Sequence, residues 1–555
     1  MCGVKQGAYF CAMKYAMKFV GHLLLLLSLS VAAPAQTVQR PKLVVGMVVD
    51  QMRWDYLYRF SNRYGSDGFK RVLKEGFNCE NTFIPYTPTY TAAGHACVYT
   101  GTTPALNGIM GNSWYSKALN RTVYCAEDYS VQTVGSTSAA GKMSPVNMQS
   151  NTITDEVRMA QNFQNKTISV AIKDRGAILP GGHTANGAYW FDNAIAGFIS
   201  STFYMTDLPP WVKAFNARRL PDVYLREPWN TLYPINTYTQ STADDKGYEN
   251  NLSGEDFTFP HVIDTTKANR YDFFKHLPAA NTYTFEMAKA AIAGESLGKR
   301  SGVTDFLAIS LSATDYLGHA TGPNSVEVED MYLRLDRDLA QFLKHLDATV
   351  GKGQYLLFIT ADHGVAHIPA FATEHKMPGG AFDDGVIRRN LNASFLKELE
   401  APNVIASIIN YQIYLNDSVI SARKIDKAWI KSRIIDSLLK YPAIAHAFDA
   451  QQMASATLPQ PVRERIINGY NQKLSGDIQF LFKPQWFDGG SRGATHGVWN
   501  PYDAHIPLLF FGWNIKPGKT HREVYMSDIA PTLGALLQVQ MPNATTGKVI
   551  EEVVQ

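Results

Sequence analysis

Five apolar runs, each ending at an acidic residue or a glycine, constrain the fold of this chain more than any other feature. A run that is apolar at nearly every position is typical of a strand buried on both faces, as in parallel sheets covered by helices. The five runs are Lys42–Asp50, Ile168–Gly176, Asp305–Asp315, Tyr355–Gly364 and Ile506–Gly512.

A helical pattern lies between two of these runs. In the segment "MYLRLDRDLAQFLKHL", four apolar residues fall on one helical face, namely Leu335, Leu339, Phe342 and Leu346. A strand, a helix and a second strand at this spacing indicate α/β architecture. We therefore predict a doubly wound, mostly parallel central sheet flanked by helices.

Two stretches do not follow this rhythm. Residues 200–280 are rich in proline, asparagine, threonine and aromatic residues without a clear period, and residues 370–490 mix short alternating strands with a helix. We predict that both are inserted cap regions over one edge of the sheet. At 555 residues and 45% hydrophobic composition, the chain can bury one large catalytic domain, which we place at residues 36–555.

Residues 1–35 have the features of a secretory signal peptide. Lysines precede an apolar core that is too short for a comfortable membrane span, and "APA" precedes Gln36. We predict a periplasmic or secreted protein without a membrane anchor. Export permits one disulfide among Cys79, Cys97 and Cys125, and buried free thiols are the equal alternative. A net charge of +3 without a basic run does not suggest a nucleic-acid binder, so we expect no nucleic-acid recognition, and we expect a monomer.

Acidic residues and histidines follow the predicted strands at the edge where α/β sheets bind ligands. Carboxylate and imidazole ligands without a thiolate suit a zinc-like cation. The set is larger than one ion needs, which favours two ions at roughly 4 Å separation. Its members are Asp50, Asp315, His319, Asp362, His363 and His496.

The stretch "TPTYTAAGHA" contains the candidate nucleophile. Small residues follow Thr91 and indicate a helix start, where free backbone N–H groups favour an anion. Metal coordination lowers the pKa of a threonine hydroxyl enough for it to act as a nucleophile. Local sequence does not separate Thr91 from Thr87 and Thr89. We expect His95 to be structural, inside the helix.

Seven motifs together resemble the alkaline phosphatase superfamily, specifically its PafA-type phosphate-irrepressible enzymes. The resemblance spans residues 48 to 507. The motifs occur in the order "VVDQMRWDYL", "TPTYTAAGH", "GIMGNSWY", "IKDRGAILPGGH", "SATDYLGHATGP", "TADHGV" and "GATHGVWNPYDAHIP".

The resemblance implies a role for each site residue. Thr91 matches the nucleophile, although Ala93 stands where the family usually has proline. One zinc ion would take Asp50, Asp362, His363 and Thr91, and the other would take Asp315, His319 and His496. Asn112, Lys173 and Arg175 match the groups that read the terminal oxygens of a phosphate monoester.

These implications predict a zinc-dependent alkaline phosphatase that hydrolyses small phosphate monoesters through a phosphothreonine intermediate. One alternative is a phosphodiesterase or nucleotide pyrophosphatase of the same superfamily, in which a site for the second ester group replaces the Lys/Arg pair. A non-catalytic phosphate-binding relative is the other, and it would lack one of the expected ligands.

Overall fold

The computed structural model describes residues 13–15, 17, 39–252 and 258–555. Residues 41–555 form one compact unit, built around a ten-stranded sheet. The predicted signal peptide lies almost entirely outside the described residues.

Five adjacent strands in the middle of the sheet are parallel. In spatial order they are β11 (Tyr355–Thr360), β1 (Leu43–Val49), β10 (Asp305–Leu311), β7 (Thr167–Ala171) and β8 (Gly187–Asp192). Every residue of these strands is buried. The predicted α/β class with a mostly parallel sheet is confirmed, and four of the five apolar runs form its centre.

The fifth apolar run lies in the sheet with the opposite direction. Strand β19 (Leu508–Gly512) is antiparallel to β11, with Leu508 opposite Thr360. The start of β19 therefore lies at the same edge of the sheet as the end of β11. A residue that precedes β19 can meet residues that follow β1, β10 and β11.

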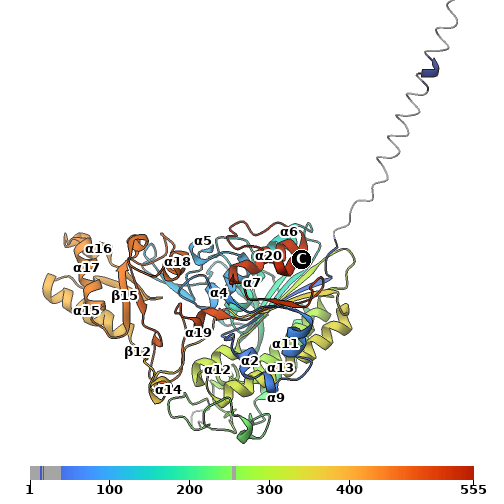
Figure 1. Cartoon of the computed structure of the whole chain (residues 1–555), viewed down its shortest axis with the longest axis horizontal. Helices are drawn as coiled ribbons and strands as arrows, with labels where there is room; N and C mark the ends of the chain where they lie inside the picture. Colours follow the sequence, from blue (N-terminus) through green and yellow to red (C-terminus); the bar gives the residue numbers. More distant parts are fainter. Residues whose placement is uncertain (1–12, 16, 18–38, 253–257) are drawn as a thin grey trace, which may run out of the picture. The chain divides into compact units, whose positions relative to one another are not determined.

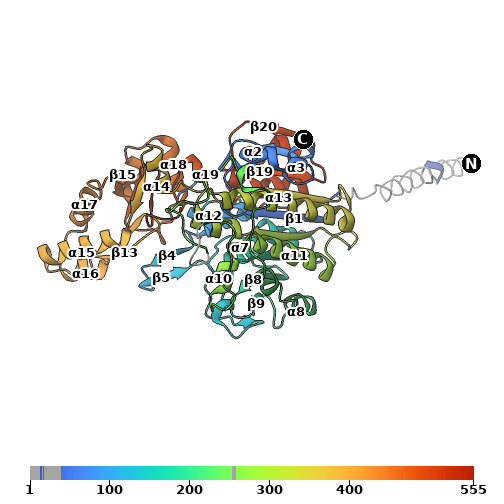
Figure 2. The ribbon, with the colours of Figure 1, turned by 90° about the horizontal axis from the view of Figure 1, so that it is seen from below.

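Helices cover both faces of the sheet (Figures 1 and 2). One layer contains α4 (Thr91–Thr100), α7 (Asp174–Gly181) and α20 (Ile529–Leu537), and the other contains α11 (Pro278–Gly294), α12 (Ala313–Thr321) and α13 (Val326–Leu346). The predicted apolar face of α13 is at most 2% exposed at Leu335, Leu339, Phe342 and Leu346.

A second, smaller sheet forms within residues 370–490. This inserted sheet consists of β13 (Ile405–Ile409), β14 (Gln412–Leu415), β16 (Ile478–Phe482) and β15 (Ile444–Asp449), all antiparallel to their neighbours. Together with α15 (Asp384–Leu399) and α17 (Lys427–Leu438), it encloses its own apolar cluster. The ribbon of this region lies at the left of Figure 1.

Residues 200–280 form short helices joined by long loops. They include α8 (Pro210–Ala217), α9 (Leu220–Tyr224) and α10 (Arg270–Phe274). Cys79, Cys97 and Cys125 are free and buried, so the disulfide alternative does not hold.

Three further short elements are named below. They are α5 (Pro104–Asn107), α18 (Gln460–Asn468) and β21 (Val524–Tyr525).

Candidate active site

Three buried aspartates meet at the carboxyl ends of the central strands, which we call the catalytic edge. Asp50 follows β1, Asp315 lies in the first turn of α12 after β10, and Asp362 follows β11. Each is at most 3% exposed. The ammonium group of Lys173 lies 2.8 Å from Asp50 Oδ2 and also contacts Asp315 Oδ2.

Three histidines at this edge share one orientation. In each ring Nδ1 lies within hydrogen-bond distance of a backbone carbonyl: His363 with Gly364 at 3.0 Å, His319 with Ala494 at 2.8 Å and His496 with Thr89 at 2.7 Å. A carbonyl only accepts, so Nδ1 carries the proton and Nε2 has a free lone pair. This is the arrangement typical of metal-binding histidines.

The ligand atoms gather into two groups that fit divalent cations. Atoms of Asp50, Asp362 and His363 lie within 4.8 Å of one another, as do atoms of Asp315, His363 and His496. Asp50 Oδ1 and Asp362 Oδ2 are buried without a hydrogen-bond partner, as expected for atoms that ligate a metal.

The first group contains three of the predicted ligands of one ion. The second contains Asp315 and His496 from the predicted set, with His363 where His319 was expected. The His363 ring stacks on that of His496 at a centroid distance of 3.4 Å. The predicted ligand His319 reaches the second group through Asp315, with its Nε2 3.2 Å from Asp315 Oδ1.

The pKa shifts of the buried aspartates also support two groups that bind cations. Burial, then repulsion from Asp315 and Asp362, raises the pKa of Asp50 well above its usual range. Burial acts in the same direction on Asp315, but His319 and Lys173 outweigh it and lower that pKa. Carboxylates buried together in this way are costly unless cations accompany them.

The structure separates the three candidate threonines. Thr91 is the first residue of α4, and its Oγ1 lies 3.3 Å from His363 Nε2. Thr87 and Thr89 instead donate their hydroxyls to the carbonyls of Gly497 and Val498, at 3.4 and 3.2 Å. Of the three side chains, that of Thr91 contacts the candidate metal ligands.

Gly94 allows α4 to approach this edge. A Cβ atom at this position would lie 2.5 Å from the carbonyl oxygen of Asp362, so a larger residue would push the helix away. One residue further on, His95 is fully buried. Its Nδ1 is 2.9 Å from the Thr91 carbonyl and 3.4 Å from Asp362 Oδ2, so it lies inside the helix yet also contacts the site.

Of the three predicted phosphate-reading residues, Asn112 contacts the Thr91 end of α4 directly. Asn112 accepts a hydrogen bond from the Ala92 amide at 3.0 Å, which leaves its Nδ2 as the donor. Lys173 and Arg175 flank the start of α7, directly after β7. Arg175 Nη1 donates to the Tyr124 hydroxyl at 3.1 Å, and its Nε is buried without a partner.

Burial disfavours the charge of Lys173, but the carboxylates of Asp315 and Asp50 outweigh it and raise its pKa. The same opposition holds at Arg175, where burial is outweighed by nearby Tyr124 and Asp174. Both side chains therefore remain cationic at this edge and can attract phosphate oxygens.

Sequence reasoning missed two buried supporting residues. Gln51 donates its backbone N–H to Asp362 Oδ1 at 3.0 Å and its Nε2 to Asp315 Oδ1 at 2.8 Å, linking the two groups. Asp503 accepts from the amides of Gly497 and Val498, each at 2.9 Å, and so shapes the loop that carries His496. Two signals in the sequence could have found them: Gln51 directly follows Asp50, and Asp503 lies within the last motif, "GATHGVWNPYDAHIP".

The inserted sheet reaches the catalytic edge through one hairpin. Asn410 and Tyr411, both with positive φ, form the two-residue turn between β13 and β14. The Tyr411 hydroxyl donates to the His496 carbonyl at 3.1 Å, and Asn410 Nδ2 donates to the carbonyl of Ser113, next to Asn112, at 2.8 Å.

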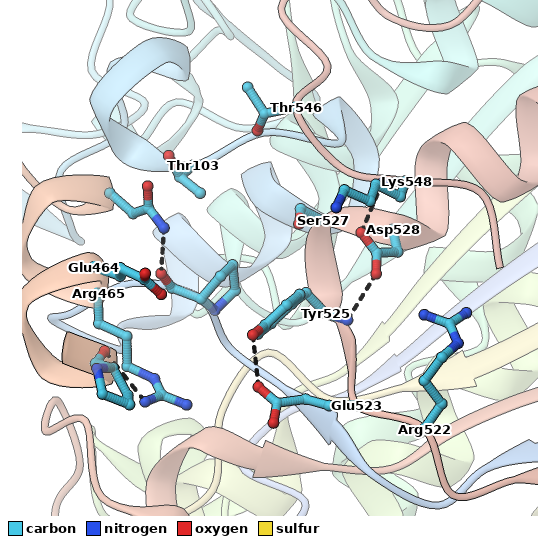
Figure 3. Close-up of a pocket in the computed structure, with 13 residues that line it drawn as sticks. Thr103, Glu464, Arg465, Arg522, Glu523, Tyr525, Ser527, Asp528, Thr546 and Lys548 are labelled. Atoms are coloured by element: carbon cyan, nitrogen blue, oxygen red, sulfur yellow. Dashed lines mark hydrogen bonds between the residues drawn. The ribbon is translucent and has the colours of Figure 1, made fainter.

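A separate hollow of about 410 Å³ lies between α5, α18 and β21 (Figure 3). None of the predicted site residues lines it. Its charged groups are engaged locally: Glu523 accepts from Tyr525, and Arg522 pairs with Glu552 outside the hollow. The convergent ligands and the candidate nucleophile are at the catalytic edge instead.

Comparisons with known proteins agree with this geometry. Residues 44–497 match the family described as type I phosphodiesterase / nucleotide pyrophosphatase. Alkaline phosphatase PhoV of Synechococcus elongatus is 54% identical, covering 94% of both chains. A protein of Myroides odoratus named calcium-transporting ATPase is 50% identical and covers 94% of this chain and 96% of that one. Alkaline phosphatase PafA of Elizabethkingia meningoseptica is 46% identical and also covers 94% of this chain and 96% of that one.

The crystal structure of PafA superposes with a TM-score of 0.91 and covers 93% of this chain and all of that one. Within the described residues, no helix combines the length and apolarity needed to cross a membrane. The named phosphatases and the shared fold show a hydrolase of phosphate esters. The chain belongs to the type I phosphodiesterase / nucleotide pyrophosphatase family, in the alkaline phosphatase group that includes PhoV and PafA.

Proposed function

We propose that this protein is an exported, zinc-dependent phosphate monoesterase that acts through a phosphothreonine at Thr91. The observation that supports it most directly is the position of the Thr91 hydroxyl, at the start of α4 and 3.3 Å from His363 Nε2. The alkaline phosphatase relatives support the same reaction class.

Six residues would hold two zinc ions: Asp50, Asp362 and His363 for one, and Asp315, His319 and His496 for the other. Bound there, the ions would supply positive charge that lowers the pKa of a nearby hydroxyl or water and stabilises the attacking and leaving oxygens. Thr91 lies beside the first set. The ion held by the second set, which includes His319, would therefore stabilise the leaving-group oxygen.

In the first step, Thr91 loses its hydroxyl proton to solvent and its Oγ1 attacks phosphorus in line. The Oγ1–P bond forms, the bond from phosphorus to the ester oxygen breaks, and the departing oxygen takes a proton from water and leaves as the alcohol. Water then hydrolyses the phosphothreonine and frees Thr91. Backbone amides at the start of α4, Asn112 Nδ2, Lys173 and Arg175 stabilise the equatorial oxygens in both steps.

Lys173 and Arg175 also favour monoesters over diesters. A monoester carries two anionic terminal oxygens, whereas a diester carries one. The planar fork of Arg175 and the point charge of Lys173 suit the additional charge. A diesterase, which the family name also covers, would gain less from these two cations.

A paired assay tests the proposal. Hydrolysis of p-nitrophenyl phosphate and of bis-p-nitrophenyl phosphate is measured on purified protein before chelation, after chelation and after zinc is added back. We expect zinc to restore a strong preference for the monoester. A zinc-restored preference for the diester would assign the protein to the diesterases, and activity that survives chelation would contradict the metal sites.

Export and organisation complete the proposal. We propose cleavage before Gln36, a periplasmic or secreted monomeric enzyme of residues 36–555, and caps at residues 200–280 and 370–490. N-terminal sequencing of the exported protein tests the cleavage site, and light scattering tests the monomeric state. A mature chain that begins before residue 30, or a stable dimer, contradicts them.

A further inference from the structure

A second hollow, of about 230 Å³, opens directly beside the catalytic edge. Its apolar and aromatic wall comes from Leu252, Phe273, His276 and Tyr316, and the candidate ligand His319 borders it. We call it the side hollow. Leu252 is 4% exposed, so this wall is continuous with the core of the molecule.

The side hollow is held in shape by contacts on each of its walls. The Asn250 amide donates to the Ala320 carbonyl at the end of α12 at 2.8 Å, and the Ala494 amide donates to the His319 carbonyl at 3.0 Å. On the opposite wall, His276 Nδ1 lies 2.9 Å from the Asp272 carbonyl. A ligand would therefore enter a preformed space, which reduces the ordering cost of binding.

The position of Tyr316 connects the side hollow to the reaction. The Lys173 ammonium lies 5.1 Å from the centre of the Tyr316 ring, and the His276 ring lies 5.6 Å from it. Tyr316 thus lies near both a proposed phosphate-reading residue and the aromatic wall, with the Lys275 ammonium also 5.4 Å from its ring centre. His319, at the border, belongs to the ligand set proposed for the leaving-group side.

The size and chemistry of the side hollow suit one aromatic ring. A cavity of roughly 150 Å³ is sufficient to hold benzene, so 230 Å³ accommodates a ring with its linking atoms. Phe273 and Tyr316 can contact such a ring edge-to-face or by offset stacking, which strengthens binding by about 2- to 10-fold beyond simple burial.

We propose that the side hollow binds the leaving group, and that the preferred substrates are phosphate monoesters whose alcohol carries an aromatic ring close to the ester oxygen. This inference rests on the proposed monoesterase function and extends it to a substrate class. Phe273 is the main specificity-determining residue, because it lines the hollow without belonging to the proposed catalytic set.

The test compares two substrates that break the same kind of bond. Both 2-phenylethyl phosphate and ethyl phosphate release a primary alcohol, so the ring is the main difference between them. With zinc-loaded enzyme, we expect a kcat/KM about tenfold higher for the phenylethyl ester. Phe273→Ala should reduce this ratio by about 3- to 10-fold. Phe203→Ala, at an exposed phenylalanine that does not line the hollow, should leave the ratio unchanged.

Binding of non-hydrolysable analogues gives a readout independent of turnover. Calorimetry on the zinc-loaded enzyme should give a lower Kd for 2-phenylethylphosphonate than for ethylphosphonate, and Phe273→Ala should reduce the difference. Phe273→Leu, which keeps an apolar side chain, should have an intermediate effect and replaces the alanine variant if that variant does not fold.

The outcomes separate the two proposals. Equal kcat/KM and equal Kd values for the two ligands of each pair in the wild-type enzyme overturn the side-hollow inference. Equal losses on both substrates in the Phe273 variants also overturn it. If zinc-loaded enzyme hydrolyses neither ester but still prefers the phenyl phosphonate, the monoesterase function fails while the side hollow remains an aromatic site.

Discussion

The central sheet and the inserted sheet contribute to the catalytic edge in different ways. Every residue of β1, β10 and β11 is buried. In the inserted sheet the inner strands β14 and β16 are also buried throughout, whereas the outer strands β13 and β15 are buried only at their first residue. A strand covered on both faces has only its ends available for chemistry. A sheet with partly exposed outer strands can also present the turn that joins an outer strand to an inner one, here β13 to β14.

The two regions accordingly supply different parts of the site. The carboxyl ends of the central strands carry the candidate ligands Asp50, Asp315 and Asp362 and the proposed phosphate-reading residue Lys173, and the segment before β19 carries His496. The hairpin of Asn410 and Tyr411 supplies hydrogen bonds to the backbone beside Asn112 and at His496. The comparison predicts that changes at the central edge alter chemistry by orders of magnitude, and that changes at the hairpin alter it modestly.

The largest effect is expected from Thr91→Ala. Loss of the nucleophile should lower kcat/KM for p-nitrophenyl phosphate by more than about 1000-fold. Zinc content and phosphate binding should remain close to wild type, as measured by metal analysis and calorimetry. The matched control is Thr89→Val, which loses only a hydroxyl that donates to a carbonyl and should stay within tenfold. A Thr91→Ala enzyme with near-full activity would exclude Thr91 as the nucleophile.

The next largest effect concerns selectivity. Arg175→Ala should lower monoester activity about 100-fold more than diester activity, because the lost guanidinium acts on the second anionic oxygen. Lys173→Ala should act in the same direction. Arg121→Ala, at an exposed arginine that pairs with Glu127, is the control and should leave both activities unchanged. Equal losses on monoester and diester would contradict the selectivity argument.

A smaller effect is expected at the hairpin. Tyr411→Phe removes the hydrogen bond to the His496 carbonyl and should lower kcat/KM by about 3- to 10-fold, in line with the net contribution of one buried hydrogen bond. Tyr414 lies in β14 of the same sheet, and its hydroxyl donates to the Leu474 carbonyl. Tyr414→Phe should lower the stability of the protein about as much as Tyr411→Phe does, without lowering kcat/KM. If both variants lose activity equally, the hairpin does not act through His496.

The smallest effect is on stability and depends on pH. Burial, then repulsion from Glu327 and Asp244, raises the pKa of Glu249 to about 10 from its ordinary 4.5. At pH values between 4.5 and about 10, Glu249 is deprotonated in the unfolded chain but keeps its proton in the folded chain. This group therefore makes the free energy of unfolding fall as pH rises through that range.

Glu249→Gln removes that dependence. Its stability gain over wild type should be small at pH 5 and reach about 1 kcal/mol or more at pH 8, as measured by chemical unfolding. Glu227→Gln, at an exposed position in the same region, should show no such trend. A gain that is the same at both pH values would indicate ordinary repacking instead of a suppressed ionisation.

Much of the central sheet could be predicted from the sequence because its strands are apolar throughout, and this pattern is local. The strand-end residues could also be placed at one edge, since parallel strands end on the same side. The direction of β19 could not be predicted, because strand direction depends on pairing with β11, about 150 residues earlier. That direction is what brings His496 to the same edge.

Contacts across long sequence separations account for what the sequence could not provide. Thr87, Thr89 and Thr91 have similar local surroundings, and only their distant partners distinguish them. The alternating pattern around Asn410 and Tyr411 indicates a hairpin, but nothing local places its tip at His496. In residues 200–280, the short helices pack through irregular loops, and no period could have revealed them.

The central position of β1 has a consequence for how the protein acquires its structure. β1 is synthesised first among the central strands, yet it pairs with β10 and β11, so that Leu43 lies opposite Asp305 and Tyr355. Pairing over such separations pays loop-closure entropy before it gains contacts, which makes folding slow. β1 therefore forms its strand pairs only after β10 and β11 have been synthesised. The candidate ligands from Asp50 to His496 come together only after His496, the last of them, has been synthesised.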